Sequence, residues 1–152
     1  MPIKTWRVYF WKDEEIGSPP AISTKEILFK NLISATLTAD INLYNLWHWT
    51  HLDSISLNGN ILPGSSGPDG AHKTYDVTPY IRDGVNTVRL DYTGGWLIGP
   101  WGRATVYMDI TAEEVKVAIP PTPIKLEWWH WLIIAGFGIA GVYLIASALL
   151  KK

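Results

Sequence analysis

Hydrophobic and polar residues alternate in short runs along the first 118 residues, and turn-forming residues separate the runs. Alternation with a period of two is typical of β-strands that bury one face. We expect such strands over 5–11, 35–40, 54–57, 86–92 and 104–110. Strands at this spacing, without a long helical pattern between them, favour an antiparallel β-sandwich or barrel.

Turn signals lie between these runs. The sequence Asn-Gly-Asn at 58–60 predicts a tight hairpin, because Asn-Gly is the strongest short hairpin signal. Asp76 and Thr78 can cap a short turn through their side-chain oxygens, and Pro79 suits the first helical position. Gly84 permits a left-handed backbone at the exit of that turn.

The pattern changes near the C-terminus. The segment 128–150 holds 23 residues without Lys, Arg, Asp or Glu. As a helix it would be about 34 Å long, which is enough to cross a bilayer with some tilt. Residues suited to the lipid headgroup level flank it: Trp128, Trp129, Trp131, Lys151 and Lys152. We therefore expect a transmembrane helix over 128–150 and a basic tail at 151–152.

Gly136, Ala140 and Ser147 share one face of this expected helix. Small residues at this spacing allow another helix to pack closely, although Gly and Ala are also simply common in such helices. The segment 119–127 holds three prolines near its start, which favour extended geometry. It is expected to be a short stiff spacer between the helix and a domain over 1–118.

Composition excludes several classes of function. The chain has no Cys, so disulfides, thiolate metal sites and a Cys nucleophile are ruled out. Lys plus Arg total 13 and Asp plus Glu total 14, and these charges are scattered. We therefore expect no nucleic-acid partner. The apolar run 8–11 stops at the charged residues 12–15, so no secretory signal is expected.

Three blocks carry a resemblance to a known family: 35–39, 55–60 and 75–88. Their sequences, Ala-Thr-Leu-Thr-Ala, Ile-Ser-Leu-Asn-Gly-Asn and Tyr-Asp-Val-Thr-Pro-Tyr-Ile-Arg-Asp-Gly-Val-Asn-Thr-Val, resemble the galactose-binding-like jelly-roll domain. That domain is an accessory module of glycoside hydrolases of the β-galactosidase and α-rhamnosidase type. Val85 stands where the family usually has Glu. The resemblance covers about 35–110 and implies a jelly-roll β-sandwich.

The same resemblance bears on catalysis, because in those enzymes the catalytic residues lie in a separate domain. No pair of carboxylates in this chain is singled out by its spacing, as a glycosidase would require. We therefore expect no enzymatic activity, no catalytic residue and no cofactor. Some members of the family carry a structural calcium, but no set of ligands maps onto this sequence.

The segment 47–53 holds His48, His51 and Asp53, which are donor types that suit zinc or copper. In a strand, however, His48 and His51 would point to opposite faces. A polar loop is the better interpretation, and we expect no metal site here.

Four tryptophans flank loops rich in Gly or His: Trp47, Trp49, Trp96 and Trp101. Three interpretations remain open for them. They can pack in the core, contact a partner protein as interface hot spots, or stack on a sugar.

Together these observations predict a non-enzymatic, single-pass membrane protein that is a structural or interaction subunit of a larger assembly. Its expected partners are the lipid bilayer and other protein subunits, in a virion with an internal membrane or in a cell envelope. Lys151 and Lys152 favour a cytoplasmic C-terminus, whereas an anchor at the end of the chain favours a cytosolic domain, so the orientation stays open. The alternatives are a membrane-anchored carbohydrate-binding module that faces the cell exterior and an accessory subunit of a membrane enzyme complex.

Overall fold

The computed structural model describes residues 2–17, 20–44, 50–93 and 102–118. The chain divides into two compact units, Met1–Pro120 and Pro121–Lys152, and every described residue belongs to the first. No helix among the described residues is long and apolar enough to cross a bilayer. The expected spacer 119–127, transmembrane helix 128–150 and tail 151–152 lie outside the described residues.

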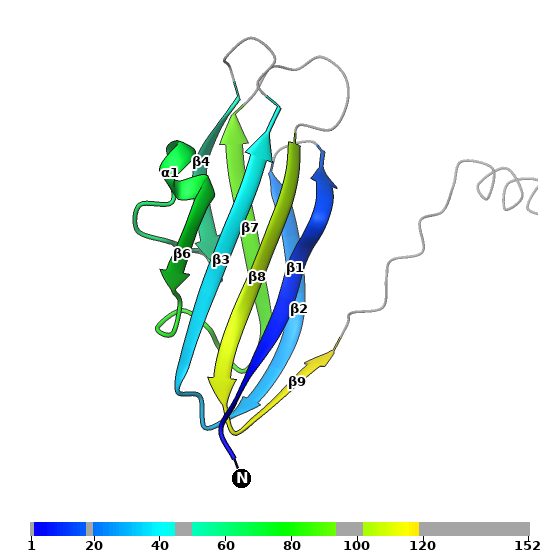
Figure 1. Ribbon diagram of the computed structural model, residues 1–152, viewed down its shortest axis with the longest axis vertical. Helices are drawn as coiled ribbons and strands as arrows, with labels where there is room; N and C mark the ends of the chain where they lie inside the picture. The colour runs from blue at the N-terminus through cyan, green and yellow to red at the C-terminus, as the bar shows by residue number, and fades with distance from the viewer. Residues whose placement is uncertain (1, 18–19, 45–49, 94–101, 119–152) are drawn as a thin grey trace, which may run out of the picture. The chain divides into compact units, whose positions relative to one another are not determined.

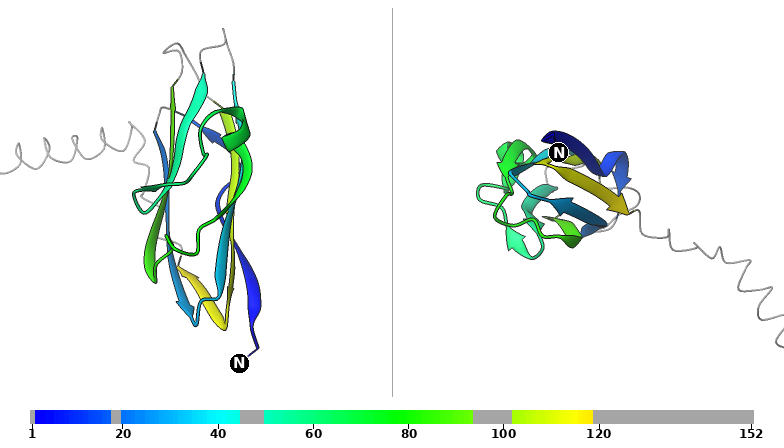
Figure 2. Two further views of the ribbon diagram at one scale, coloured as in Figure 1. Left: turned by 90° about the vertical axis from the view of Figure 1, so that its left-hand side faces the viewer. Right: turned by 90° about the horizontal axis from the view of Figure 1, so that it is seen from below.

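The described part of the chain is mainly β-structure in two antiparallel sheets, as the alternating pattern predicts (Figure 1). One sheet has the strand order β1-β8-β3-β6, and the other has the order β5-β4-β7-β2-β9. The two sheets face each other as layers (Figure 2, left). The elements are β1 (Lys4–Ile16), β2 (Ala21–Lys30), β3 (Ser34–Leu43), β4 (His51–Leu57), β5 (Asn60–Ile61), α1 (Gly67–Ala71), β6 (His72–Asp76), β7 (Gly84–Thr93), β8 (Gly102–Ala112) and β9 (Glu114–Ala118).

The pairing of the strands is nested along the chain. β1 pairs with β8, β2 with β7, β3 with β6, and β4 with β5, and every one of these pairs is antiparallel. The sheets are completed by the pairs β3–β8, β4–β7 and β2–β9. The chain therefore folds back on itself as one long hairpin whose two arms are divided between the two layers.

The core lies between the sheets and comes from alternate residues of each strand. In β8, Ala104, Val106, Met108 and Ile110 are buried, while the residues between them are half-exposed. In β7, Val88, Leu90 and Tyr92 are all buried, as the alternation over 86–92 predicts. Burial of one face on this scale supplies most of the favourable free energy of folding.

A β-bulge near the middle of β1 changes this alternation. The register with β8 shifts between Tyr9 and Trp11, and again between Trp11 and Glu14. Since a bulge turns an extra residue out of the alternation, Phe10 and Trp11 are both buried. Asp13 in the second shift has a φ of 51° and bonds Arg103 of the neighbouring strand through its carboxylate.

Both predicted turns are confirmed. Asn58 and Gly59 have φ values of 54° and 84°, and Leu57 pairs with Asn60 across them, as in a two-residue hairpin loop. In the second turn, Thr78 donates to Asp76 Oδ1 from its backbone N (3.0 Å) and from its hydroxyl (2.6 Å). Gly84 has a φ of 95°, a conformation that side chains disfavour.

Candidate functional site

The segments that carry the four predicted tryptophans join strand ends that lie at one end of the sandwich (Figure 1). Residues 45–49 connect β3 to β4, and residues 94–101 connect β7 to β8. In one sheet the end of β3 lies beside the start of β8, because Leu43 pairs with Gly102. In the other sheet the start of β4 lies beside the end of β7, because His51 pairs with Thr93. Trp47, Trp49, Trp96 and Trp101 themselves lie outside the described residues.

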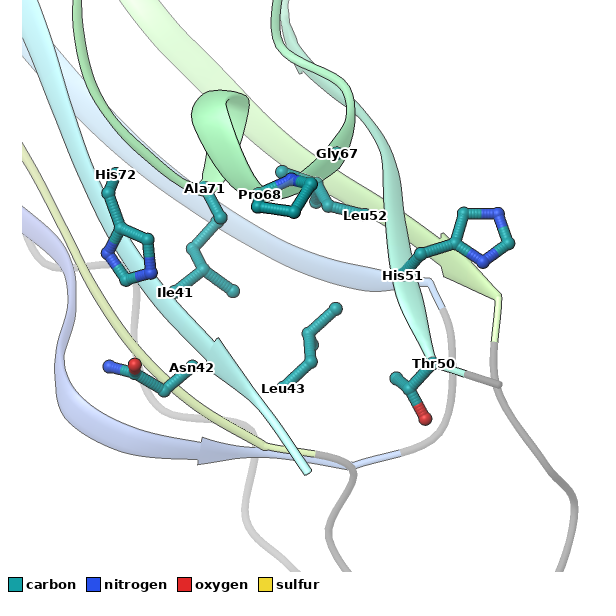
Figure 3. A pocket seen from close by; sticks show the side chains of 10 residues that line it. All are labelled: Ile41, Asn42, Leu43, Thr50, His51, Leu52, Gly67, Pro68, Ala71 and His72. Atoms are coloured by element: carbon teal, nitrogen blue, oxygen red, sulfur yellow. The ribbon is translucent and has the colours of Figure 1, made fainter. Parts of the chain in front are cut away.

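A pocket of about 220 Å³ opens at this same end, between β3 of one sheet and β4 of the other. Figure 3 shows the side chains around it, with His51 and His72 on opposite sides. Most of the lining is apolar, and Asn42, Thr50 and the two histidines supply the polar part. The apolar lining consists of Ile41, Leu43, Leu52, Pro68 and Ala71.

The pocket exists because the two outer strands are short. β6 reaches only as far as the pair His72 with Asp40, whereas β3 continues to Leu43. β5 pairs only with Ser56 and Leu57, whereas β4 begins at His51. In the described part of the chain, no strand covers the outer edges of β3 and β4 at this end, and α1 lines one side of the pocket.

The wall made by α1 is held by specific bonds. The buried Ser65 hydroxyl accepts the N–H of Ile55 (3.0 Å) and donates to its carbonyl oxygen (3.3 Å). The Tyr75 hydroxyl donates to the carbonyl oxygen of Gly70 (2.6 Å), and burial raises the pKa of that phenol. A Cβ at Gly70 would collide with the backbone of Ser65. The pocket is therefore bounded by a fixed loop and not by loosely packed chain.

Each histidine at the pocket is oriented by a carboxylate. His72 Nδ1 lies 2.8 Å from Asp40, and His51 Nε2 lies 2.9 Å from Asp53. Asp53 also accepts the Thr93 hydroxyl at 2.6 Å. An ionised carboxylate only accepts hydrogen bonds, so each histidine donates from the nitrogen that faces it. Both contacts are exposed, so they orient the rings more than they stabilise the fold.

The predicted polar loop over 47–53 is wrong at its C-terminal end, because His51 and Asp53 lie in strand β4. His48 lies outside the described residues. Within the described ranges, no group of three His, Cys, Asp or Glu residues is placed to hold a metal ion. In the strand, His51 and Asp53 bond each other.

Several carboxylates elsewhere in the sandwich are bound to cations or hydroxyls. Arg7 makes two bonds of 2.8 Å to Asp109, and its guanidinium lies 4.0 Å above the Tyr107 ring. Arg103 holds the pKa of Asp13 below its ordinary value through a side-chain hydrogen bond. The Thr78 hydroxyl lowers the pKa of Asp76 in the same way, and Lys116 lowers that of Glu114.

Sequence reasoning missed the pocket and the residues that form it. The helix α1 has a local signal, because Ser66-Gly67-Pro68 places a proline in the first turn of a helix. The apolar lining has no local signal, since it depends on where β5 and β6 end. The remaining predicted contact residues, which also lie outside the described residues, are Trp128, Trp129, Trp131, Gly136, Ala140, Ser147, Lys151 and Lys152.

Comparison with known proteins adds no further identification. A scan against models of protein families, a search of curated proteins and a search of solved structures each returned no match to this chain.

Proposed function

We propose that the chain is a non-enzymatic structural or interaction protein, anchored in a membrane by residues 128–150. The observation that carries the proposal is the uncharged 23-residue segment, with tryptophans at one end and two lysines at the other. A β-sandwich on such an anchor has a defined surface to offer to other subunits. A virion with an internal membrane and a cell envelope are the two settings that suit this design.

The domain in this proposal is a galactose-binding-like jelly roll. The nested pairing supports it, since pairing β1 with β8, β2 with β7, β3 with β6 and β4 with β5 wraps one long hairpin into two layers. β9 is then an addition beside β2. The blocks that resemble the family also contact each other here, because Asn58 bonds Asn86. Such a fold serves many functions, so it describes how the domain is built and not what it binds.

The hydrogen bonds that three of its carboxylates make to neighbouring side chains support a non-enzymatic role. A general acid at neutral pH needs a pKa that is raised by burial or by a like charge. The pKa values of Asp13, Asp76 and Glu114 lie below their ordinary values, which is the opposite of what a general acid needs. Each of these groups is bound to a neighbouring side chain and serves the fold.

A carbohydrate-binding module is the second candidate, and the pocket is the observation that favours it. Its polar residue Thr50 directly follows the segment 45–49, which carries Trp47 and Trp49, and Asn42 pairs with Arg103, two residues after Trp101. A glycan array separates the two candidates. Specific, saturable sugar binding that is lost in Trp96→Ala and Trp101→Ala would favour the carbohydrate-binding module over a purely structural role.

Protease protection of the native membrane or particle tests the first proposal, with antibodies to the domain and to the Lys151–Lys152 tail. If the domain is digested only after an outer shell is removed, it lies between membrane and shell, as a linking subunit should. If protease removes it at once from intact cells or particles, it faces the exterior and the linking role is rejected.

A further inference from the structure

We infer that the pocket between β3, β4 and α1 seats one apolar side chain of an extended, basic segment of a partner protein. The inference rests on the proposed function as an interaction protein and names the surface and the chemistry of its partner. Four features of the described residues carry it: the size and lining of the pocket, the unpaired edge of β3, the charges around it and its fixed wall.

The size and lining of the pocket suit a single side chain. Its volume of about 220 Å³ is below the range of about 300–1,000 Å³ that small-molecule sites occupy. The lining from Ile41, Leu43 and Leu52 is aliphatic, and Pro68 and Ala71 of α1 add to it (Figure 3). An apolar side chain that enters a hole of this kind is the usual anchor of a protein interface.

The backbone of β3 at the pocket can pair with an added strand. Ala35 shows which positions face the outer edge, because its N–H donates to Thr78 (3.0 Å) and its carbonyl accepts from Val77 (2.9 Å). Backbone groups alternate between the two edges of a strand, so Leu43, eight residues on, faces the same edge. That position lies beyond the last pair with β6, Asp40 with His72. An extended segment can therefore bond Leu43 while its side chain enters the pocket.

The charges around the pocket favour basic residues in that segment. Asp40 and Asp53 hold the two histidines, and Asp69 is exposed on α1 without an ion pair to a described residue. Arg103 is paired with Asp13, whereas Lys73 lies over the Tyr75 ring and keeps its positive charge, so of these two cations Lys73 alone opposes the three carboxylates. A Lys or Arg on either side of the apolar residue would face net negative charge, and salt would weaken its attraction.

The fixed wall means that binding orders little of the described chain. Ser65, Gly70 and Tyr75 hold the loop before and through α1 by the bonds described above. A preformed pocket spares the entropy of ordering a loop, so a short peptide can bind measurably.

The test is a titration of the full chain in detergent micelles, followed by amide NMR shifts. The probe is the peptide acetyl-Lys-Val-Leu-Val-Lys-amide, and two matched peptides replace Leu by Asp or both Lys by Glu. We expect saturable shifts at Ile41, Leu43, Leu52 and Ala71, with at least tenfold weaker binding of both matched peptides. Absence of shifts at these residues, or equal binding of all three peptides, would overturn the inference.

Two variants locate the binding. Ala71→Met should fill the pocket and abolish the shifts, whereas Ser66→Met, in the same loop but outside the lining, should leave them unchanged. If Ala71→Met unfolds the domain, the double variant Asp40→Asn with Asp53→Asn, at two exposed positions, tests the inference instead. It should weaken binding of the Lys peptide at least threefold and should not weaken binding of the Glu peptide.

Other occupants give other results. If lactose shifts the same residues and the peptide does not, the pocket binds a sugar and the inference is rejected. If these residues shift with protein concentration alone, the occupant is a second copy of this chain and the inference is also rejected. The proposed function is tested separately by protease protection. A domain shielded by a shell, in a protein that binds none of the peptides, would reject this pocket and retain the linking role.

Discussion

Asn58 in the β4–β5 turn donates from its side-chain amide to the side-chain oxygen of Asn86, 28 residues away in β7, at 2.9 Å. Asn86 is fully buried, and its own amide donates to the carbonyl oxygens of Arg82 (2.6 Å) and Gly84 (3.0 Å). Its oxygen also accepts the Arg82 N–H at 3.0 Å, and the Asn58 oxygen accepts the N–H of Thr87. The two asparagines are therefore bonded to each other and to backbone groups of Tyr80, Arg82, Gly84 and Thr87.

Replacement of Asn86 by Ala should lower the free energy of unfolding by about 2–4 kcal/mol, because several buried polar groups lose their partner at once. Chemical denaturation of the two proteins measures this difference. Asn60→Ala is the matched control, since that exposed side chain makes one bond, of 3.3 Å, to Leu57 and should cost about 0.5 kcal/mol or less. An equal effect of both substitutions would show that the Asn58–Asn86 network contributes nothing special.

The loop that bounds the pocket gives a second prediction. Gly70→Ala places a Cβ against the backbone of Ser65, which cannot move without breaking its bonds to Ile55. We expect a loss of about 1–3 kcal/mol in stability, which is typical of overpacking a tight site. Gly17→Ala is the control, because no atom lies within 4 Å of its added Cβ and its φ is not positive. A Gly70→Ala protein as stable as the Gly17→Ala protein would mean that the loop is free to shift.

Strands with one buried face could be predicted from the sequence. β7 and β8 alternate cleanly because most of their outer positions carry Thr, Asp or Arg, so the period of two is visible without any structure. The hairpin at Asn58 and Gly59 was also predictable, since its turn type demands those residues.

Strand β2 was not predictable for a physical reason. Ile22 and Leu28 lie on its outer face with exposures of 55% and 40%. The half-buried Lys25 lies on the other face, two residues before the buried Ile27. The polar and apolar residues therefore do not separate by face, and the period of two is lost. The pocket was hidden too, because it depends on two strands that end early and on a helix that packs beside them, and none of these leaves a local pattern.

The bond between Asp76 and Thr78 gives a pH-dependent prediction. The Thr78 hydroxyl and N–H lower the pKa of Asp76, so its folded pKa lies below the unfolded value of about 3.9. A group of this kind stabilises the fold above the unfolded pKa, and that stabilisation is lost as the pH falls through the folded pKa. We expect the melting temperature of the native protein to fall more than that of Asp76→Asn between about pH 6 and about pH 3.

The control for this experiment is Asp69→Asn, which changes an exposed carboxylate that accepts no hydrogen bond from a described residue. Its melting temperature should follow the native pH profile. If Asp76→Asn and the native protein lose the same number of degrees over this range, the turn at Thr78 does not depend on the charge of Asp76.

The membrane anchor gives the last prediction, which concerns residues 128–150. An Arg near the centre of a spanning helix costs about 3 kcal/mol on insertion, so Ile139→Arg combined with Val142→Arg should cost about 6 kcal/mol. We expect the native chain to stay with membranes during alkaline carbonate extraction and the double variant to be released. The matched control is Ile22→Arg with Val85→Arg, two exposed residues on one face of the sandwich, and this variant should stay with the membrane. Release of the native chain would reject the anchor, and retention of the central double variant would show that another part of the chain holds it. Since the anchor is the observation on which the proposed function rests, release of the native chain would also remove the reason to place the sandwich at a membrane.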